Sequence, residues 1–312
     1  GAMTHSLSSP TSDGAIQCIG TSPAESYVAA GSSQGKIRVW DTVTGELVKI
    51  LSTTSSVEAL TFTFQATMLT GGGDGSITVW HVGGSWYKMT TFTGHSRRVT
   101  ALATSNNGNT VVSSGYETTS SPYFFDYSIR VWDVSSETAT KTMTVSRPAT
   151  SASSLAIHNS VLASSHPNEK VRLWNVQAST PAPMLLSMDW NLPLNVLAFS
   201  ANDAYLAVGE DDRLRVWDVG TKAMATIPID CYPTSVAFSG DSITYYVAVG
   251  CAGNPSVQVY HRSSANCLVN WRATLLRLRR LRSRGKATHF FRAARTGRYE
   301  LGMFRRSNFF PC

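Results

Sequence analysis

The stretch IRVWD occurs twice in this 312-residue chain, as Ile37–Asp41 and as Ile129–Asp133. Similar stretches recur along the chain: ITVWH at 77–81, VRLWN at 171–175, LRVWD at 214–218, VQVYH at 257–261 and, more weakly, YELGM at 299–303. The aromatic residue of each stretch lies at position 40, 80, 132, 174, 217 or 260, and Gly302 takes its place in the last one. Apart from one longer interval between 80 and 132, the spacing is nearly constant. The chain is therefore an array of one repeated unit.

Each unit contains the same series of short segments. An alternating apolar run opens the unit, as in Val57–Phe62, Val99–Thr104 and Leu194–Phe199, and a polar turn and a small-residue run such as YVAAGS from Tyr27 follow it. Short alternating runs between turn residues are typical of antiparallel strands. Four such strands repeated every 40–45 residues or so predict the blades of a β-propeller, in which stacked neighbours bury both faces of each sheet. We therefore expect an all-β chain that forms a single propeller.

The repeated phrase resembles that of the WD-repeat family, and the resemblance covers residues from about 15 to 303. In that family a Gly-His pair, a hydroxyl residue, a turn aspartate and the tryptophan form a hydrogen-bonded tetrad. The resemblance implies such a tetrad in the third unit, from His95, Ser113 or Ser114, Asp126 and Trp132. Gly94-His95 is the only Gly-His pair in the sequence, so the other units are expected to depend more on packing. A satisfied buried polar network explains His95 and Asp126 better than a catalytic pair does.

The C-terminal segment decides between six and seven blades. Residues 1–14 are expected to hold an expression scar (Gly1 to Met3) and a closing strand near His5 to Ser9, and residues 15–271 hold six recognisable units. Residues 272–312 then form a degenerate seventh blade, because a turn at Ala293–Arg298 and YELGM follow at the right interval. The crowded arginines argue against a buried inner strand there. A six-bladed ring with a basic tail, or a tail from an alternative reading frame, remains open.

The charge of the chain is distributed unevenly. Residues 272–312 carry 12 basic residues and one acidic residue, whereas the rest of the chain has a slight acidic excess. Basic blocks of this kind often contact nucleic acid or acidic partners, although a solvated chain end has the same composition. The basic segment of interest is Arg277, Arg279, Arg280, Arg282 and Arg284.

Other classes of function are disfavoured by the sequence. It has no phosphate-binding loop, nucleophile elbow or paired zinc ligands, so we expect no enzyme and no cofactor or metal. Five scattered cysteines indicate neither a disulfide framework nor a zinc site, which favours the cytoplasm or the nucleus. No apolar run approaches the length of a membrane span. The oligomeric state is not predicted.

Binding residues are expected on the top face, where propellers of this family expose the loops that precede the first strand and follow the second. The third unit has an insertion there, from Tyr116 to Asp126, which accounts for its greater length. Loop aromatic and arginine residues are common in binding hot spots, although the insertion could also fold onto its own blade. The candidates are Arg97, Arg98, Tyr116, Tyr123, Phe124, Phe125, Trp190 and Tyr232.

Two functions fit these features. The first is a non-catalytic scaffold that binds partner peptides on the top face within a multiprotein complex. The alternative is a propeller that associates with nucleic acid, in RNA processing or ribosome biogenesis, through its arginine-rich C-terminal segment.

Overall fold

The computed structural model defines the fold over most of the chain. It describes residues 3–23, 26–63, 65–105, 108–118, 125–134, 138–144, 152, 154–166, 171–178, 184–185, 194–200, 204–210, 212–229, 231–240, 245–252, 256–261, 267–272, 287–293 and 298–305. These residues form β-strands and one short 3-10 helix, η1 (Thr11–Asp13). The predicted all-β fold is confirmed.

Six sheets contain four strands each, and every pairing in them is antiparallel. The first three sheets consist of β2 (Ile16–Thr21), β3 (Tyr27–Ser32), β4 (Lys36–Asp41) and β5 (Leu47–Ser52); β6 (Val57–Phe62), β7 (Thr67–Gly72), β8 (Ile77–His81) and β9 (Tyr87–Phe92); and β10 (Val99–Thr104), β11 (Thr110–Thr118), β12 (Phe125–Asp133) and β13 (Thr138–Thr144). The next three consist of β14 (Ser154–His158), β15 (Val161–Ser165), β16 (Arg172–Asn175) and β17 (Met184–Leu185); β18 (Leu194–Phe199), β19 (Tyr205–Glu210), β20 (Arg213–Asp218) and β21 (Met224–Pro228); and β22 (Pro233–Gly240), β23 (Tyr245–Cys251), β24 (Ser256–His261) and β25 (Cys267–Arg272).

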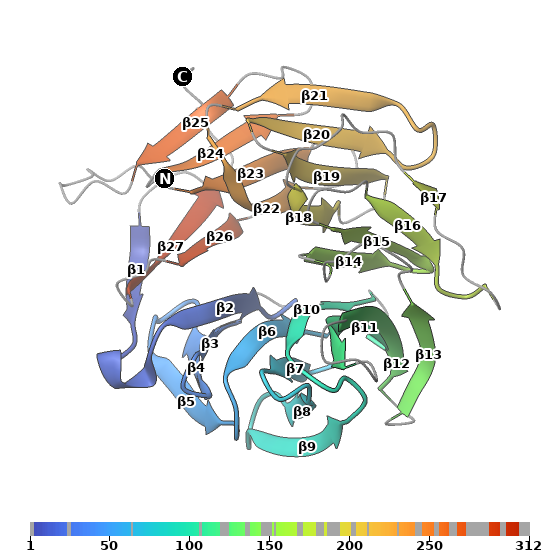
Figure 1. Cartoon of the computed structure of the whole chain (residues 1–312). Helices are drawn as coiled ribbons and strands as arrows, with labels where there is room; N and C mark the ends of the chain where they lie inside the picture. Colours follow the sequence, from blue (N-terminus) through green and yellow to red (C-terminus); the bar gives the residue numbers. More distant parts are fainter. Residues whose placement is uncertain are drawn as a thin grey trace.

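The sheets are arranged around a central axis, with the first strand of each sheet innermost (Figure 1). The first strands of consecutive sheets contact one another from β2 through β6, β10, β14 and β18 to β22. Within each sheet the strands follow one another in chain order from the centre outward. This meander is the blade of a propeller.

The aromatic residue of the repeated phrase joins each sheet to the sheet before it. Trp80 packs in one cluster with Ile37 and Val39 of the first sheet, and Trp132 packs with Ile77 and Val79 of the second. The six aromatic side chains at this position are almost completely buried: Trp40, Trp80, Trp132, Trp174, Trp217 and Tyr260. Because large aromatic side chains bury the most apolar surface, these contacts are a main source of stability between blades.

Small residues near the end of the second strand allow neighbouring sheets to approach closely. A Cβ atom added at Gly71 would lie 2.6 Å from Val99 Cγ1 of the next sheet, and one at Gly209 would lie 2.8 Å from the Pro233 ring. Each glycine leaves the space that the first strand of the following sheet fills.

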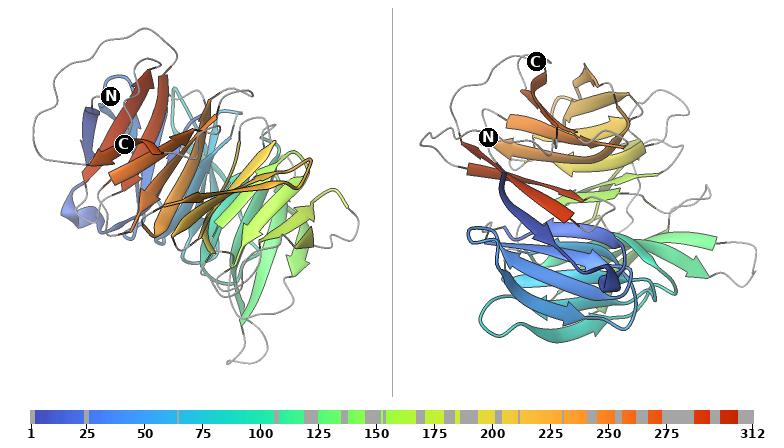
Figure 2. Two further views of the ribbon diagram at one scale, coloured as in Figure 1. Left: turned by 90° about the horizontal axis from the view of Figure 1, so that it is seen from above. Right: turned by 90° about the vertical axis from the view of Figure 1, so that its left-hand side faces the viewer.

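A further sheet pairs the two ends of the chain. Its order is β1 (Met3–Ser8), β27 (Arg298–Arg305) and β26 (Ala287–Ala293), and β26 contacts both β22 and β2. Figure 2 shows these strands between the first and the sixth sheets. Leu7 of β1 is buried against Trp40. It thus gives Trp40 the contact that the preceding sheet gives to the other aromatic residues of the repeated phrase. Residues 273–286, which would complete this sheet, lie outside the described part, so the count of seven blades stays a prediction.

The insertion in the third unit lengthens two strands. β11 and β12 form nine consecutive pairs, from Thr110 with Asp133 to Thr118 with Phe125. The first strand of this sheet, β10, begins at Val99, which pairs with Gly115 of β11. The fourth strand, β13, ends at Thr144, which pairs with Ser128 of β12. The last three pairs therefore extend past the other two strands as a two-stranded ribbon.

Candidate interaction face

The top face is the side of the ring on which the first strand of each sheet begins and the second strand ends. Three positions of each sheet decide how this end is held together. The first is the loop before the first strand. The second, here called the hydroxyl position, is the residue of the second strand that pairs with the second residue of the repeated phrase. The third is the residue two places further along the chain. In the third sheet these are the loop around His95, then Ser113, which pairs with Arg130, and then Gly115.

The third sheet contains a buried hydrogen-bonded chain. The indole N–H of Trp132 donates to Ser113 Oγ at 2.7 Å, and this oxygen lies 2.6 Å from His95 Nε2. The other ring nitrogen, His95 Nδ1, lies 3.3 Å from Ser128 Oγ. A Cβ atom at Gly115 would lie 2.7 Å from His95 Nδ1, so glycine is needed for the ring to enter. The structure thus brings together three of the four expected tetrad residues, with Ser113 and not Ser114 as the hydroxyl.

Asp126 is placed differently from the expected tight turn. It lies within β12, opposite Glu117, because the insertion extends the strand instead of the turn. Its side chain lies outside the described part of the structure, so its role in the tetrad stays a prediction.

The fourth sheet contains a similar chain that sequence reasoning missed. Trp174 Nε1 donates to Ser164 Oγ at 2.9 Å, and His166 Nε2 lies 3.1 Å from the same oxygen. His166 occupies the position that corresponds to Gly115, directly after β15, so its ring reaches the serine from the end of the second strand and not from the loop before the first strand. The fourth unit thus adds a histidine–serine–tryptophan link to its packing without a Gly-His pair, and the full tetrad of the third unit stays a prediction. The signal was present as Ser-Ser-His before the repeated phrase.

The other sheets replace the histidine by other polar links. In the second sheet Trp80 Nε1 donates to Thr70 Oγ1 at 2.9 Å. The first sheet has Ala30 at the hydroxyl position, opposite Arg38, and Arg38 forms an ion pair with Asp13 of the preceding loop. These blades therefore depend on specific polar contacts as well as on packing.

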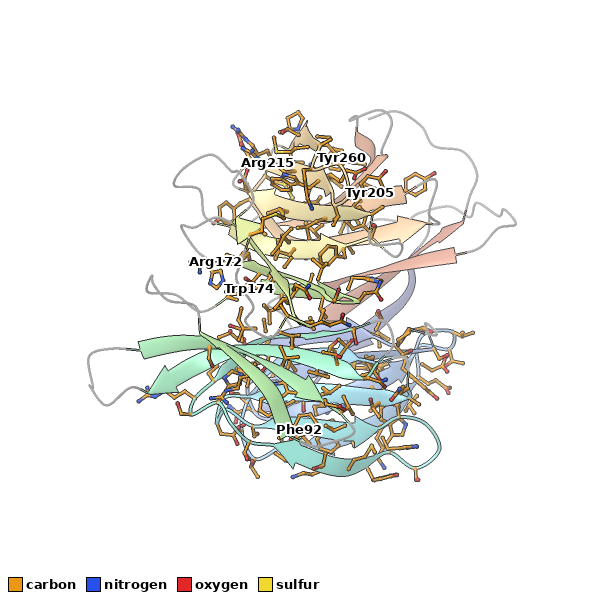
Figure 3. All side chains as sticks on the ribbon, turned by 90° about the vertical axis from the view of Figure 1, so that its right-hand side faces the viewer. Phe92, Arg172, Trp174, Tyr205, Arg215 and Tyr260 are labelled. Atoms are coloured by element: carbon orange, nitrogen blue, oxygen red, sulfur yellow. A yellow bond between two sulfur atoms is a disulfide. The ribbon has the colours of Figure 1, made fainter. Side chains whose placement is uncertain are left out.

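A deeply buried ion pair takes this place in the fifth sheet. Val208 stands at the hydroxyl position, and Arg215 Nε lies 2.6 Å from Glu210 Oε2, with side chains that are 5% and 0% exposed. Figure 3 shows Arg215 on this sheet, and Arg172 with Trp174 on the sheet before it. The carboxylates of Glu210 and Asp212 therefore serve in structural contacts, the second in an exposed pair with Arg213.

The sixth sheet corrects the prediction about cysteines. Val249 stands at its hydroxyl position, and Cys251, two residues later, forms a disulfide with Cys231 of the preceding loop. The sequence did not indicate this bond, because the two cysteines are separated by 20 positions and meet only through the pairing of β22 with β23. Cys18 is a free cysteine whose sulfur lies 3.6 Å from the Val57 carbonyl oxygen, and burial raises the pKa of its thiol to about 12.

Arg97 and Arg98 lie exposed on the top face, on the loop that His95 anchors. The backbone of this loop packs against the turn at Gly75, where a Cβ atom would lie 2.7 Å from the Arg97 carbonyl oxygen. Arg98 Nη2 lies 3.4 Å from Glu58 Oε1 on the first strand of the neighbouring sheet, and Ser56 Oγ donates to the same carboxylate oxygen at 2.6 Å. The loop is thus fixed on both sides while its two arginines face outward.

The remaining binding candidates are described less completely. Tyr232 is half-buried on the loop before β22. Tyr116 and Phe125 lie in the two-stranded ribbon, and their side chains are outside the described part. Other predicted residues lie entirely outside it: Tyr123, Phe124, Trp190, Arg277, Arg279, Arg280, Arg282 and Arg284.

The described residues offer neither a metal site nor a membrane-spanning helix. Within the described ranges, no three His, Cys, Asp or Glu side chains are grouped as a metal site would require. The described residues also contain no helix long and apolar enough to cross a membrane.

Comparison with protein families agrees with the geometry. The family model for the WD domain, G-beta repeat, matches residues 1–41, 45–81, 86–133 and 190–218, and each match ends on the last residue of a repeated phrase. No curated protein matches the chain. The repeat, the four-stranded sheets and these matches together place the chain in the WD-repeat family, whose propellers generally act as interaction scaffolds without catalytic activity.

Proposed function

We propose that this protein is a non-catalytic scaffold that binds partner peptides on its top face within a multiprotein complex. The observation that carries the proposal is the loop of residues 95–98. His95 and Gly75 fix its backbone, whereas Arg97 and Arg98 are exposed. A rigid loop loses little conformational entropy when a partner binds, so its side chains can contribute most of their contact energy to affinity.

The chemistry of this surface favours a particular class of partner. Arginine is common in binding hot spots and forms bidentate hydrogen bonds with carboxylates. The Arg98 guanidinium already lies near the Glu58 carboxylate, so the site is arranged for acidic groups. We therefore expect peptide partners that carry aspartate or glutamate beside apolar residues, which the predicted aromatic side chains would contact.

The test compares affinity capture of partners by matched variants of the full chain. Arg97→Ala combined with Arg98→Ala removes both exposed cations, and Lys88→Ala removes an exposed cation from the outer strand β9 as a control. We expect the double variant to lose specific partners that the wild type and the control retain, with the circular dichroism spectrum unchanged. Equal partner recovery by all three proteins would refute a top-face site at this loop.

Nucleic-acid binding is the second candidate, and the charge asymmetry favours it. The 12 basic residues in residues 272–312 include Arg277, Arg279, Arg280, Arg282 and Arg284. Phosphate contacts lose affinity steeply as the salt concentration rises, because bound counterions are released when they form. A salt titration of RNA binding by the full chain separates this function from peptide binding. Either function suits a protein of the cytoplasm or the nucleus.

A further inference from the structure

Cys231 and Cys251 occupy a distinctive place in the sixth sheet. Cys251 is the last residue of β23, and Cys231 lies two residues before β22 begins. Their Cα atoms are 5.7 Å apart, and a disulfide joins them. The bond therefore connects the loop that enters the sheet to the end of its second strand.

The third sheet makes the same connection without a covalent bond. There the loop residue His95 reaches Ser113 by a hydrogen bond and fills the space above Gly115. Pairing places Val249 across from Gln258 in the same way that Ser113 lies across from Arg130, so Cys251 corresponds to Gly115. Val249 cannot accept a hydrogen bond through its side chain. The disulfide thus occupies the place at which the third sheet uses the hydrogen bond between His95 and Ser113.

The reduced form of this pair would also be satisfied. Cys231 Sγ lies 3.8 Å from Gln258 Oε1, and this oxygen accepts a hydrogen bond from the Tyr260 hydroxyl at 2.8 Å. A Cys231 thiol could therefore donate to Gln258 after the disulfide opens. Because an unpaired buried polar group would oppose opening, the presence of this acceptor makes both oxidation states compatible with a folded sheet.

The chemistry of the thiols differs between these cysteines and Cys18. All three side chains are half-buried, and the pair lies at the open end of its sheet. The Cys18 thiol contacts the Val57 carbonyl, and its pKa of about 12 leaves almost no thiolate at neutral pH. Since the thiolate is the reactive form, exchange with a dissolved reagent is expected at the pair and not at Cys18.

We propose that Cys231 and Cys251 form a thiol–disulfide exchange site for small disulfides of the glutathione type. One cysteine thiolate attacks a sulfur of oxidised glutathione and releases one glutathione thiolate, which leaves a mixed disulfide on the protein. The other cysteine thiolate attacks the protein sulfur of this intermediate and releases the second glutathione. Two protein thiols are oxidised and one glutathione disulfide is reduced to two thiols, so the exchange is balanced and reversible.

Exchange at this site controls the loop that carries Tyr232. Pro233, the next residue, is buried against Gly209 of the fifth sheet, and Ala252 N–H donates to the Tyr232 carbonyl at 2.7 Å. Beyond the pair of Pro233 with Cys251, the ladder continues from Ser235 with Gly250 to Gly240 with Tyr245. Reduction is therefore expected to free residues 231–232 locally and to leave the sheet intact. The consequence for partner binding rests on the proposed function, because it requires the top face to be the binding surface.

The primary experiment titrates the full chain with glutathione buffers that range from reducing to oxidising. Native protein is then alkylated with N-ethylmaleimide and the modified cysteines are located by peptide mass spectrometry. We expect Cys231 and Cys251 to be protected together toward the oxidising end, while Cys18 stays unmodified throughout. Each of Cys231→Ser and Cys251→Ser should accumulate a mixed disulfide with glutathione on the remaining cysteine. A chain with Cys267→Ser and Cys312→Ser should behave like the wild type.

The second measurement follows the loop itself. Hydrogen exchange of the amides of residues 231 and 232 should become faster by roughly tenfold or more on reduction, whereas residues 235–238 should change little. Reduction should also lower the melting temperature of the wild type by about 5 °C and leave Cys231→Ser unaffected. Full alkylation of both cysteines in the oxidising buffer, or exchange rates that do not respond to reduction, would overturn the proposal. None of these measurements involves a partner, so partner capture in both redox states tests the top-face function separately.

Discussion

The indole N–H of the repeated tryptophan is a buried donor, and neighbouring blades satisfy it with different groups. Ser113 and Ser164 accept this hydrogen bond in the third and fourth sheets, and each serine also contacts a histidine ring. Thr70 accepts it in the second sheet without a described histidine contact. Each serine hydroxyl thus contacts both an indole N–H and a histidine ring, so its removal leaves two buried polar groups without that contact.

We predict that Ser113→Ala and Ser164→Ala each destabilise the protein by about 1–3 kcal/mol, because both leave buried donors or acceptors without a partner. Ser85→Ala, at an exposed turn, is the matched control and should change stability by less than about 0.5 kcal/mol. Urea unfolding monitored by tryptophan fluorescence provides the comparison. Unfolding midpoints that are equal for all three variants would contradict the hydrogen-bonded chains.

The two ion pairs of the fifth sheet allow a sharper comparison. Glu210→Ala leaves the Arg215 guanidinium buried without its carboxylate, which should cost about 3–5 kcal/mol. Asp212→Ala removes a pair in which both side chains are at least 37% exposed, and such pairs contribute about 0–1 kcal/mol. The expected order of unfolding midpoints is therefore wild type, then Asp212→Ala close to it, then Glu210→Ala far below. The reverse order would show that burial does not set the strength of these pairs.

Some of these polar contacts could be predicted from the sequence, and others could not, for physical reasons. The resemblance to the WD-repeat family, through the Gly94-His95 pair before the third unit, implied a link between His95 and Ser113 or Ser114, and the structure shows it with Ser113. His166 departs from that pattern, since it follows directly on the second strand, β15. The disulfide and the Glu210–Arg215 pair depend on which residues face each other across strands, and this register is not visible in spacing alone.

At the scale of strands, the alternation of apolar residues and the positions of turn residues were sufficient to predict the bounds of several strands. The predicted runs Val57–Phe62, Val99–Thr104 and Leu194–Phe199 are β6, β10 and β18 with the same bounds. The insertion at Tyr116–Asp126 was less predictable, because a polar and aromatic sequence can form either a loop or a longer hairpin. The structure shows the longer hairpin, because β11 and β12 continue to pair as far as Thr118 with Phe125.

The turn between β14 and β15 gives a prediction about pH. His158 is buried at the end of β14, and this burial lowers its pKa below the usual value, with the neighbouring Asn159 side chain opposing the shift. The unfolded chain therefore binds a proton more readily, at a pKa of about 6.5. Stability is complete above that pH and falls as the pH drops from there through the lower pKa of the folded state.

We accordingly expect the melting temperature of the wild type to fall between pH 7.5 and pH 5.5, and His158→Gln to reduce this dependence. Calorimetric scans of both proteins at several pH values supply the comparison, with Lys88→Ala as a surface control. The same pH slope in His158→Gln and in the wild type would exclude His158 as the group responsible.

At the scale of the whole molecule, closure of the ring depends on segments from both ends of the chain. β1 pairs with β27, β26 contacts the first and sixth sheets, and Leu7 takes the place against Trp40 that the preceding sheet takes for the other aromatic residues. The interval of the repeat predicted a seventh unit with a closing strand near His5 to Ser9, whereas the crowded arginines near position 280 argued against a buried inner strand there. Whether the basic segment adds a fourth strand to this sheet is the point on which the seven-blade prediction depends.

Truncation of the chain after Trp271 tests that architecture directly. The shortened protein lacks β26 and β27, so β1 loses its partner and the neighbouring sheets gain unpaired edges that associate with other chains. We expect it to aggregate or to melt well below the wild type, and Leu7→Ala in the full chain to cost about 2–5 kcal/mol through the cavity beside Trp40. Light scattering and thermal melts measure both effects, and limited trypsin digestion provides an independent check. If truncation leaves the melting temperature unchanged, or trypsin removes residues 272–312 from a remainder of unchanged stability, the C-terminal segment is a basic arm on a six-bladed ring.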